Sequence, residues 1–292
     1  MQFVFLPISF LYFPLVYTDI FSLLMVLLAF YFSLEKKPKL TALFSLGAVL
    51  TRQTNIIWVL FIWLYEFVSA FGFSFSWKNC LTYLRQSFGQ LLVFFAFTVF
   101  VFANKGIAIG DTKSHQAGLF LGNIYLFLAL AGLLFWPFLL SALKKIDRSK
   151  LERFLIFGVG IGAIFALSFA FFPPALHIYN LKLTFLRNII LNGAYHQYTW
   201  AYVLAIFVGY LTIFLMKFEK QALLLFPLTF LVLAPSFLVE QRYAIISLVL
   251  LILLRKEEKE KDDEKIQLFM VFYFLLLSLA LMYMLLKMNL FF

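Results

Sequence analysis

The chain has 292 residues, of which 64% are hydrophobic and 13% are charged, and its mean hydropathy is +0.97. A soluble protein of this size cannot hide so large an apolar share, because water must wet its surface, so the composition excludes a soluble enzyme, a disordered protein and a disulfide scaffold. The single cysteine, Cys80, cannot form an internal disulfide. The sequence therefore predicts an all-α, polytopic integral membrane protein.

Long apolar runs separated by charged segments predict about eleven transmembrane helices. Several of them approach the roughly 20 residues that a helix needs to cross about 30 Å of hydrocarbon. They cover residues 3–17, 20–34, 40–51, 55–72, 87–103, 118–140, 153–172, 199–216, 222–238, 243–254 and 266–286. Residues 77–86 are predicted to form an amphipathic segment on the cytosolic face. No Pro/Gly/Ser-rich linker divides the chain, so residues 1–292 are predicted to form one transmembrane domain.

The formal net charge of +10 is typical of nucleic-acid-binding proteins, but here its distribution points elsewhere. Basic residues alternate between rich and poor loops, and the rich loops of membrane proteins are cytosolic. The rich loops contain Lys36, Lys37, Lys39, Lys78, Arg85, Lys144, Lys145, Arg148, Lys150, Arg153, Lys217, Lys220, Arg255, Lys256, Lys259, Lys261 and Lys265. Membrane topology thus explains most of the positive charge, and no nucleic acid partner is predicted.

A second population of polar residues lies at the outer ends of the predicted spans. Charge near hydrocarbon costs roughly 2.5–3.5 kcal/mol per Asp, Lys or Arg at a helix centre, and topology does not require positive charge on this side. These residues either form a functional site at the outer membrane boundary or simply face water at the interface. They include Asp19, Arg52, Asp111, Lys113, His115, His196, Glu240 and Arg242.

The strongest cluster is the string RQTN at residues 52–55. Arg52, Gln53 and Asn55 offer fixed donors for phosphate or sugar oxygens, although a polar tip between two helices would have the same composition. Asp19 in a turn is compatible with a helix cap.

Two further clusters follow along the chain. Asp111 and His115 would share a face if helical, with Lys113 between them, but this spacing does not supply the three or more ligands that a metal requires, so no metal and no cofactor are predicted. Glu240 and Arg242 either neutralise each other, or Arg242 binds an anionic head group while Tyr243 lies at the membrane interface.

These strings resemble the dolichyl-phosphate-glucose α-1,2-glucosyltransferases, which add the last glucose to the dolichol-linked oligosaccharide precursor. The most specific string is RQTNIIWV at residues 52–59, close to a hallmark of that family. YTD at 17–19, GD at 110–111 with Lys113 and His115, HQYTW at 196–200 and EQRY at 240–243 are similar to further family segments and occur in the family's order. The family begins with a further span and an acidic lumenal loop, so the resemblance implies that this chain is shortened at its N-terminus.

The resemblance implies a GT-C-like membrane glycosyltransferase of the endoplasmic reticulum, with its active face in the lumen. Glucose on a lipid phosphate would be transferred to a sugar hydroxyl with inversion, which requires a carboxylate base and cations at the departing phosphate. Asp111 is the expected base, and Arg52 and Arg242 are expected to bind the phosphate. The remaining expected substrate-binding residues are Asp19, Gln53, Asn55, Lys113, His115, His196, Glu240 and Tyr243.

Two other classes of function stay open. A multi-pass transporter or flippase of a lipid-linked or anionic substrate would place charge near the bilayer midplane, whereas the polar residues here gather at one face. A shortened, catalytically inactive relative would bind lipid or protein partners only. The expected partners of an active enzyme are dolichyl-phosphate-glucose, the dolichol-linked oligosaccharide and membrane lipid.

Overall fold

The computed structural model describes residues 6–12, 18–73, 76–107, 118–146, 148–173, 189–256 and 261–288. Within these ranges the regular structure is helical, apart from an isolated antiparallel bridge between Phe218 and Arg255. The predicted all-α fold is therefore confirmed for the described part of the chain. Asp111, Lys113 and His115 lie outside the described residues.

The chain divides into two compact units that are each built from separated stretches of sequence. Unit 1 comprises Met1–Pro14, Gly118–Phe218 and Leu233–Phe292, and unit 2 comprises Leu15–Ala117 and Glu219–Val232. Each unit is described by itself. That residues 1–292 form one transmembrane domain stays a prediction.

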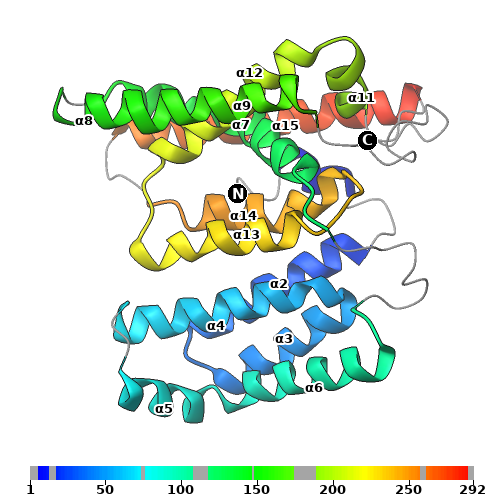
Figure 1. The fold of residues 1–292 in the computed structure, drawn as a ribbon, viewed down its shortest axis with the longest axis vertical. Helices are drawn as coiled ribbons and strands as arrows, with labels where there is room; N and C mark the ends of the chain where they lie inside the picture. Colours follow the sequence, from blue (N-terminus) through cyan, green and yellow to red (C-terminus); the bar gives the residue numbers. More distant parts are fainter. Residues whose placement is uncertain are drawn as a thin grey trace. The chain divides into compact units, whose positions relative to one another are not determined.

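Unit 2 consists mainly of apolar helices. Its elements are α2 (Thr18–Leu34), α3 (Pro38–Thr51), the short 3₁₀-helix η1 (Gln53–Asn55), α4 (Ile56–Phe71), α5 (Trp77–Gln86), α6 (Phe88–Asn104), the 3₁₀-helix η4 (Lys220–Leu224) and most of α13 (Leu225–Leu233). Helix α2 packs on α3 and α4, and α3 packs on α6, so these four helices lie side by side (Figure 1). Val49, Val59 and Val93 form a buried cluster between α3, α4 and α6.

Helix α5 confirms the expected amphipathic segment at residues 77–86. The chain bends by 81° between α5 and α6. Tyr83 holds α5 to α4 because its single O–H donor lies within hydrogen-bond distance of two acceptors on α4, the carbonyl oxygen of Trp63 (2.6 Å) and Glu66 Oε2 (2.8 Å). Trp63 in turn donates from Nε1 to the hydroxyl of Ser87 (2.9 Å). Glu66, the only acid in the α4 span, is thus bonded within unit 2.

Unit 1 is built around α7. Its elements are α1 (Pro7–Tyr12), α7 (Gly122–Leu143), α8 (Arg148–Arg153), the π-helical segment η3 (Phe154–Gly160), α9 (Ile161–Phe171), α11 (Ile189–His196), α12 (Thr199–Leu215), the 3₁₀-helix η5 (Gln241–Ala244), α14 (Ile245–Leu253) and α15 (Lys261–Met288). Helix α12 packs along α7 and against α9, and α15 also contacts α7 (Figure 1).

Two glycines permit the close crossing of α7 and α12. A Cβ added to Gly209 would lie 1.8 Å from the carbonyl oxygen of Leu128, and one added to Gly132 would lie 2.1 Å from that of Ala205. Small residues allow helix backbones to approach in this way, and close packing is a main source of stability between helices in lipid. The crossing therefore depends on the absence of a side chain at both positions.

Within the residues that the structure describes, four helices are long and apolar enough to cross a membrane, at Gln53–Phe71, Gly122–Leu143, Leu151–Phe171 and Glu264–Tyr283. The bent pair of α5 and α6 makes a fifth candidate, and five shorter apolar helices have 10–17 residues. Each of the eleven predicted runs contains at least one helix in the described part of the chain. Because a 17-residue helix is only about 25 Å long, the count of eleven crossings is not confirmed.

Candidate functional site

The first candidate cluster is an ion pair in unit 2 between Asp19 and Arg52. Asp19 lies in the first turn of α2, where a carboxylate is favoured by the partial positive charge of the helix N-terminus. Arg52 lies in the extended link between α3 and η1, with φ −149° and ψ 123°. Arg52 Nη2 is 2.6 Å from Asp19 Oδ1, and the side chains are 23% and 3% exposed. The carboxylate is thus buried, whereas part of the guanidinium reaches the surface.

Asn55 connects three helices beneath this ion pair. Its Nδ2 donates to the hydroxyl of Ser22 on α2 (2.7 Å) and to the carbonyl of Ala48 on α3 (2.7 Å). Asn55 precedes α4 and is 1% exposed. Both N–H donors of this amide are engaged inside unit 2, so the structure assigns Asn55 the role of fixing the backbone that carries Arg52. Gln53, which follows Arg52, is half-buried.

Replacing Asn55 with alanine is expected to destabilise the protein by about 1–3 kcal/mol, because the two buried hydrogen bonds from its Nδ2 to the Ser22 hydroxyl and to the Ala48 carbonyl are lost, at roughly 0.5–1.5 kcal/mol each. The thermal midpoint of the detergent-solubilised protein, followed by size-exclusion chromatography, measures the change. Thr54→Ala, at the exposed neighbouring position, is the matched control and should leave the midpoint unchanged. Equal midpoints for the two variants would show that the amide does not hold these helices together.

The second candidate cluster is a half-buried ion pair in unit 1 between Glu240 and Arg242. Arg242 Nε donates to Glu240 Oε2. The Arg242 side chain is 25% exposed and the Glu240 side chain is 11% exposed. The Arg242 guanidinium also lies over the ring of Tyr243, 5.5 Å from its centroid. The structure thus contains the ion pair on which the first of the two alternatives for Glu240 and Arg242 depends, and it does not test binding of a head group by Arg242. A quarter of the Arg242 side chain stays exposed.

A residue that the sequence analysis missed, Asn123, positions this second pair. Its Nδ2 donates to the carbonyls of Ser236 (3.1 Å) and Leu238 (2.8 Å), and its Oδ1 accepts from the backbone N–H of Glu240 (3.1 Å). Asn123 lies in the first turn of α7 and is 1% exposed. Its one signal in the sequence is a lone amide at the start of a long apolar run.

Of the other predicted residues, Gln53 follows Arg52 in the chain, and Asp111, Lys113 and His115 lie outside the described residues. His196 ends α11 and is exposed. The structure therefore brings together Asp19, Arg52 and Asn55 in unit 2, and Glu240, Arg242 and Tyr243 in unit 1. Among the residues that the structure describes, no group of three or more His, Cys, Asp or Glu is placed to hold a metal ion.

Both clusters share one chemical design. In each, a carboxylate holds an arginine by one part of its guanidinium, and the arginine side chain stays about a quarter exposed. A guanidinium has five N–H donors in a planar fork, so it can bind a carboxylate and a phosphate at once. Such an arrangement suits recognition of an anionic group without a metal.

Comparison with known proteins shows to which family this chain belongs. The chain matches the model of the DIE2/ALG10 family over residues 1–76 and 67–253. The chain belongs to the DIE2/ALG10 family. Every predicted site residue lies inside the stretches that match the DIE2/ALG10 model, which confirms the resemblance seen in the sequence.

Individual relatives agree with the DIE2/ALG10 assignment. The chain is 27% identical to a human protein named Dol-P-Glc:Glc(2)Man(9)GlcNAc(2)-PP-Dol alpha-1,2-glucosyltransferase, over 81% of this chain and 58% of the human protein. Proteins of the same name from Debaryomyces hansenii (24% identical, 84% of this chain, 60% of the relative) and Candida albicans (27%, 84% and 59%) are also similar. The chain thus spans about three fifths of the length of these curated relatives. No solved structure matches it.

Proposed function

We propose that this chain transfers glucose from dolichyl-phosphate-glucose to the dolichol-linked oligosaccharide and forms its terminal α-1,2-linked glucose. Membership of the DIE2/ALG10 family carries this proposal, since the matched relatives bear the name of that activity. The proposed enzyme is a GT-C-like protein of about eleven transmembrane helices, placed in the endoplasmic reticulum membrane with its active face in the lumen. Its partners are the two dolichol-linked substrates and the surrounding lipid.

The phosphate of the donor is assigned to the two arginines. As the bond between the anomeric carbon and the phosphate oxygen breaks, negative charge grows on the phosphate, and fixed cations stabilise that charge. Arg242 is preorganised by Glu240 and Tyr243, and Arg52 by Asp19. Each arginine is held in place by its own carboxylate, so binding of the phosphate requires less ordering of that side chain.

The acceptor half of the reaction requires a base. Attack of the sugar hydroxyl on the anomeric carbon, from the side opposite the phosphate, inverts the configuration and releases the hydroxyl proton to a carboxylate. Asp111 is proposed for this role on the strength of the family resemblance. Gln53, Asn55, Lys113, His115 and His196 are proposed to contribute to the sugar and phosphate sites, Asn55 by holding the backbone beside Arg52.

Expression of the chain in cells that lack the endogenous enzyme tests the proposal. The lipid-linked oligosaccharides of these cells should shift from the diglucosylated to the triglucosylated species, which mass spectrometry of the released glycans separates. Wild-type cells show the profile expected for full activity, and deficient cells with an empty vector show the profile expected for no activity. Continued accumulation of the diglucosylated species, with the protein present at normal levels in the membrane, would leave only a non-catalytic binding or transport role.

A further inference from the structure

A cavity of about 400 Å³ in unit 1 is separate from both arginine–carboxylate pairs. Four elements converge on it: the C-terminal ends of α7, α12 and α14, and the start of η3. In the predicted topology all four ends lie on the cytosolic side, opposite the proposed glycosyl-transfer site. The sequence analysis assigned the basic residues of these loops to topology alone, and the structure adds that they meet at one place.

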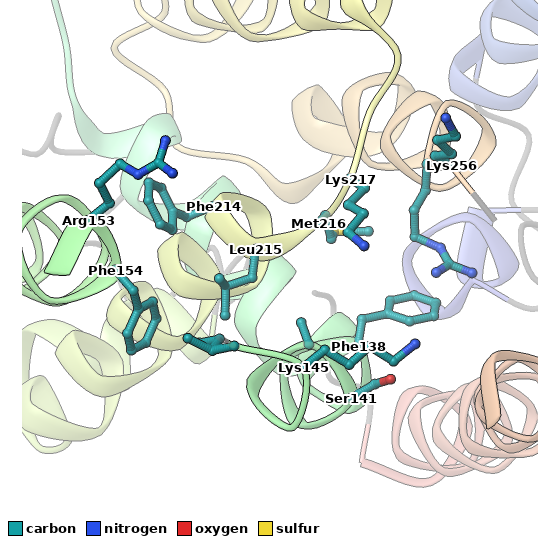
Figure 2. Close-up of a pocket in the computed structure, with 13 residues that line it drawn as sticks. Phe138, Ser141, Lys145, Arg153, Phe154, Phe214, Leu215, Met216, Lys217 and Lys256 are labelled. Carbon is teal, nitrogen blue, oxygen red and sulfur yellow. The ribbon is translucent and has the colours of Figure 1, made fainter. Parts of the chain in front are cut away.

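Among the described residues that line this cavity, five are basic and none is acidic. The basic residues are Lys145, Arg153, Lys217, Arg255 and Lys256. Figure 2 shows Arg153 beside Phe214 at one end of the cavity, and Lys217 and Lys256 toward the other. Like charges placed together repel each other, and a concave, low-dielectric wall strengthens their combined field, so the cavity attracts anions.

The backbone and an aromatic ring hold these cations in place. The N–H of Lys256 donates to the carbonyl of Lys217 (2.8 Å), next to the antiparallel bridge between Phe218 and Arg255. The end of α12 is therefore bonded to the end of α14. The Arg255 guanidinium lies 4.2 Å from the ring centroid of Phe138 on α7, which fixes its orientation by a cation–π contact.

The remaining wall of the cavity is apolar. It includes Phe138, Phe154, Phe214, Leu215 and Met216. A soluble anion would gain nothing from these side chains, whereas a lipid offers a phosphate to the cations and the start of its acyl chains to the apolar wall. Basic pockets between helix ends on the cytoplasmic side are suited to phospholipid head groups for this reason.

We propose that this cavity binds the phosphate-bearing head group of an anionic phospholipid from the cytosolic leaflet. The volume of about 400 Å³ is within the range of small-molecule sites, large enough for a head group with more than one phosphate. The charges of Arg153, Lys217 and Lys256 meet the phosphate oxygens from different elements, while Arg255 stays stacked on Phe138.

Binding of a fluorescent short-chain phosphatidylinositol 4-phosphate to the purified full chain in neutral detergent tests this proposal. Arg153, Lys217 and Lys256 are exposed, so replacing all three with glutamine removes charge without opening the core. At about 1 kcal/mol per basic residue, the triple variant should bind the lipid about 100-fold more weakly. Phosphatidylcholine with the same label and chain length should not compete.

The matched control removes the same number and kinds of charge elsewhere. Lys39, Lys78 and Arg85 are exposed residues of unit 2 on the same predicted side, and their triple glutamine variant should keep wild-type affinity. If both triple variants lose the same affinity, general surface charge explains the binding and the proposal is wrong. If free inositol 1,4-bisphosphate competes as well as the lipid does, the site serves a soluble phosphate compound and the assignment to lipid is wrong.

Discussion

Arg242→Lys is expected to lower kcat/KM for transfer from dolichyl-phosphate-glucose by about 10²-fold. The substitution keeps the charge but removes the planar fork that lets one side chain bind Glu240 and a phosphate together. Since the phosphate gains charge as the glycosidic bond breaks, most of the loss should fall on kcat rather than on KM. Glucosyl transfer by the detergent-solubilised protein, measured across a range of donor concentrations, separates the two constants.

Arg85→Lys is the control for this prediction, because Arg85 is an exposed arginine at the end of α5 and belongs to neither cluster. It should retain wild-type kinetics. The thermal midpoint of both variants must also match that of the wild type, which excludes a loss of folded protein. A fully active and stable Arg242→Lys enzyme would mean that the Glu240–Arg242 pair serves only to hold its loop.

The helices of this protein were predictable because hydropathy is a local property. Each apolar run contains a helix, and the amphipathic segment at 77–86 forms α5 before a sharp bend. The number of membrane crossings was less accessible. The helix of the predicted run 222–238, for example, ends at Leu233, so this apolar run extends beyond the helix that forms in it. Hydropathy identifies apolar segments but does not show where the backbone leaves the helix.

The residues of the two clusters were predictable from their chemistry, but their partners were not. Arg52 pairs with Asp19, and Asn55 bonds to Ser22, across intervals of about thirty residues that no local pattern specifies. Asn123 holds a loop more than a hundred residues away, through three hydrogen bonds. Such contacts depend on which helices pack together, and packing is decided by the whole chain.

The basic loops show that the sequence alone also does not reveal which charged residues come together in the fold. The rule that basic residues flank the cytosolic ends of spans accounts for where Arg153, Lys217 and Lys256 occur in the sequence. It treats each loop as independent, and so it cannot indicate that three helix ends and η3 converge on one cavity. A charge that topology explains in sequence can therefore acquire a second role once neighbouring loops meet.

Gly209→Ala is expected to be the most damaging single substitution for stability, although it adds one methyl group. An added Cβ would lie 1.8 Å from the Leu128 carbonyl oxygen and 2.8 Å from the backbone nitrogen of Gly132. These are backbone atoms of α7, so no side chain can rotate away and the helices themselves must separate. Overpacking of a core commonly costs about 1–3 kcal/mol, and a rigid backbone contact belongs at or above the upper end of that range.

Gly160→Ala makes the same change in a helical segment of unit 1 where the structure has room. Its Cβ would lie 3.4 Å from the carbonyl oxygen of Leu155, which is ordinary van der Waals contact. The thermal midpoint of this variant should match or slightly exceed that of the wild type, since alanine favours helix over glycine. Gly209→Ala should lower the midpoint strongly or abolish the monodisperse peak in size-exclusion chromatography. Equal stability of the two variants would show that α7 and α12 do not cross in contact, and would remove the packing on which the arrangement of unit 1 rests.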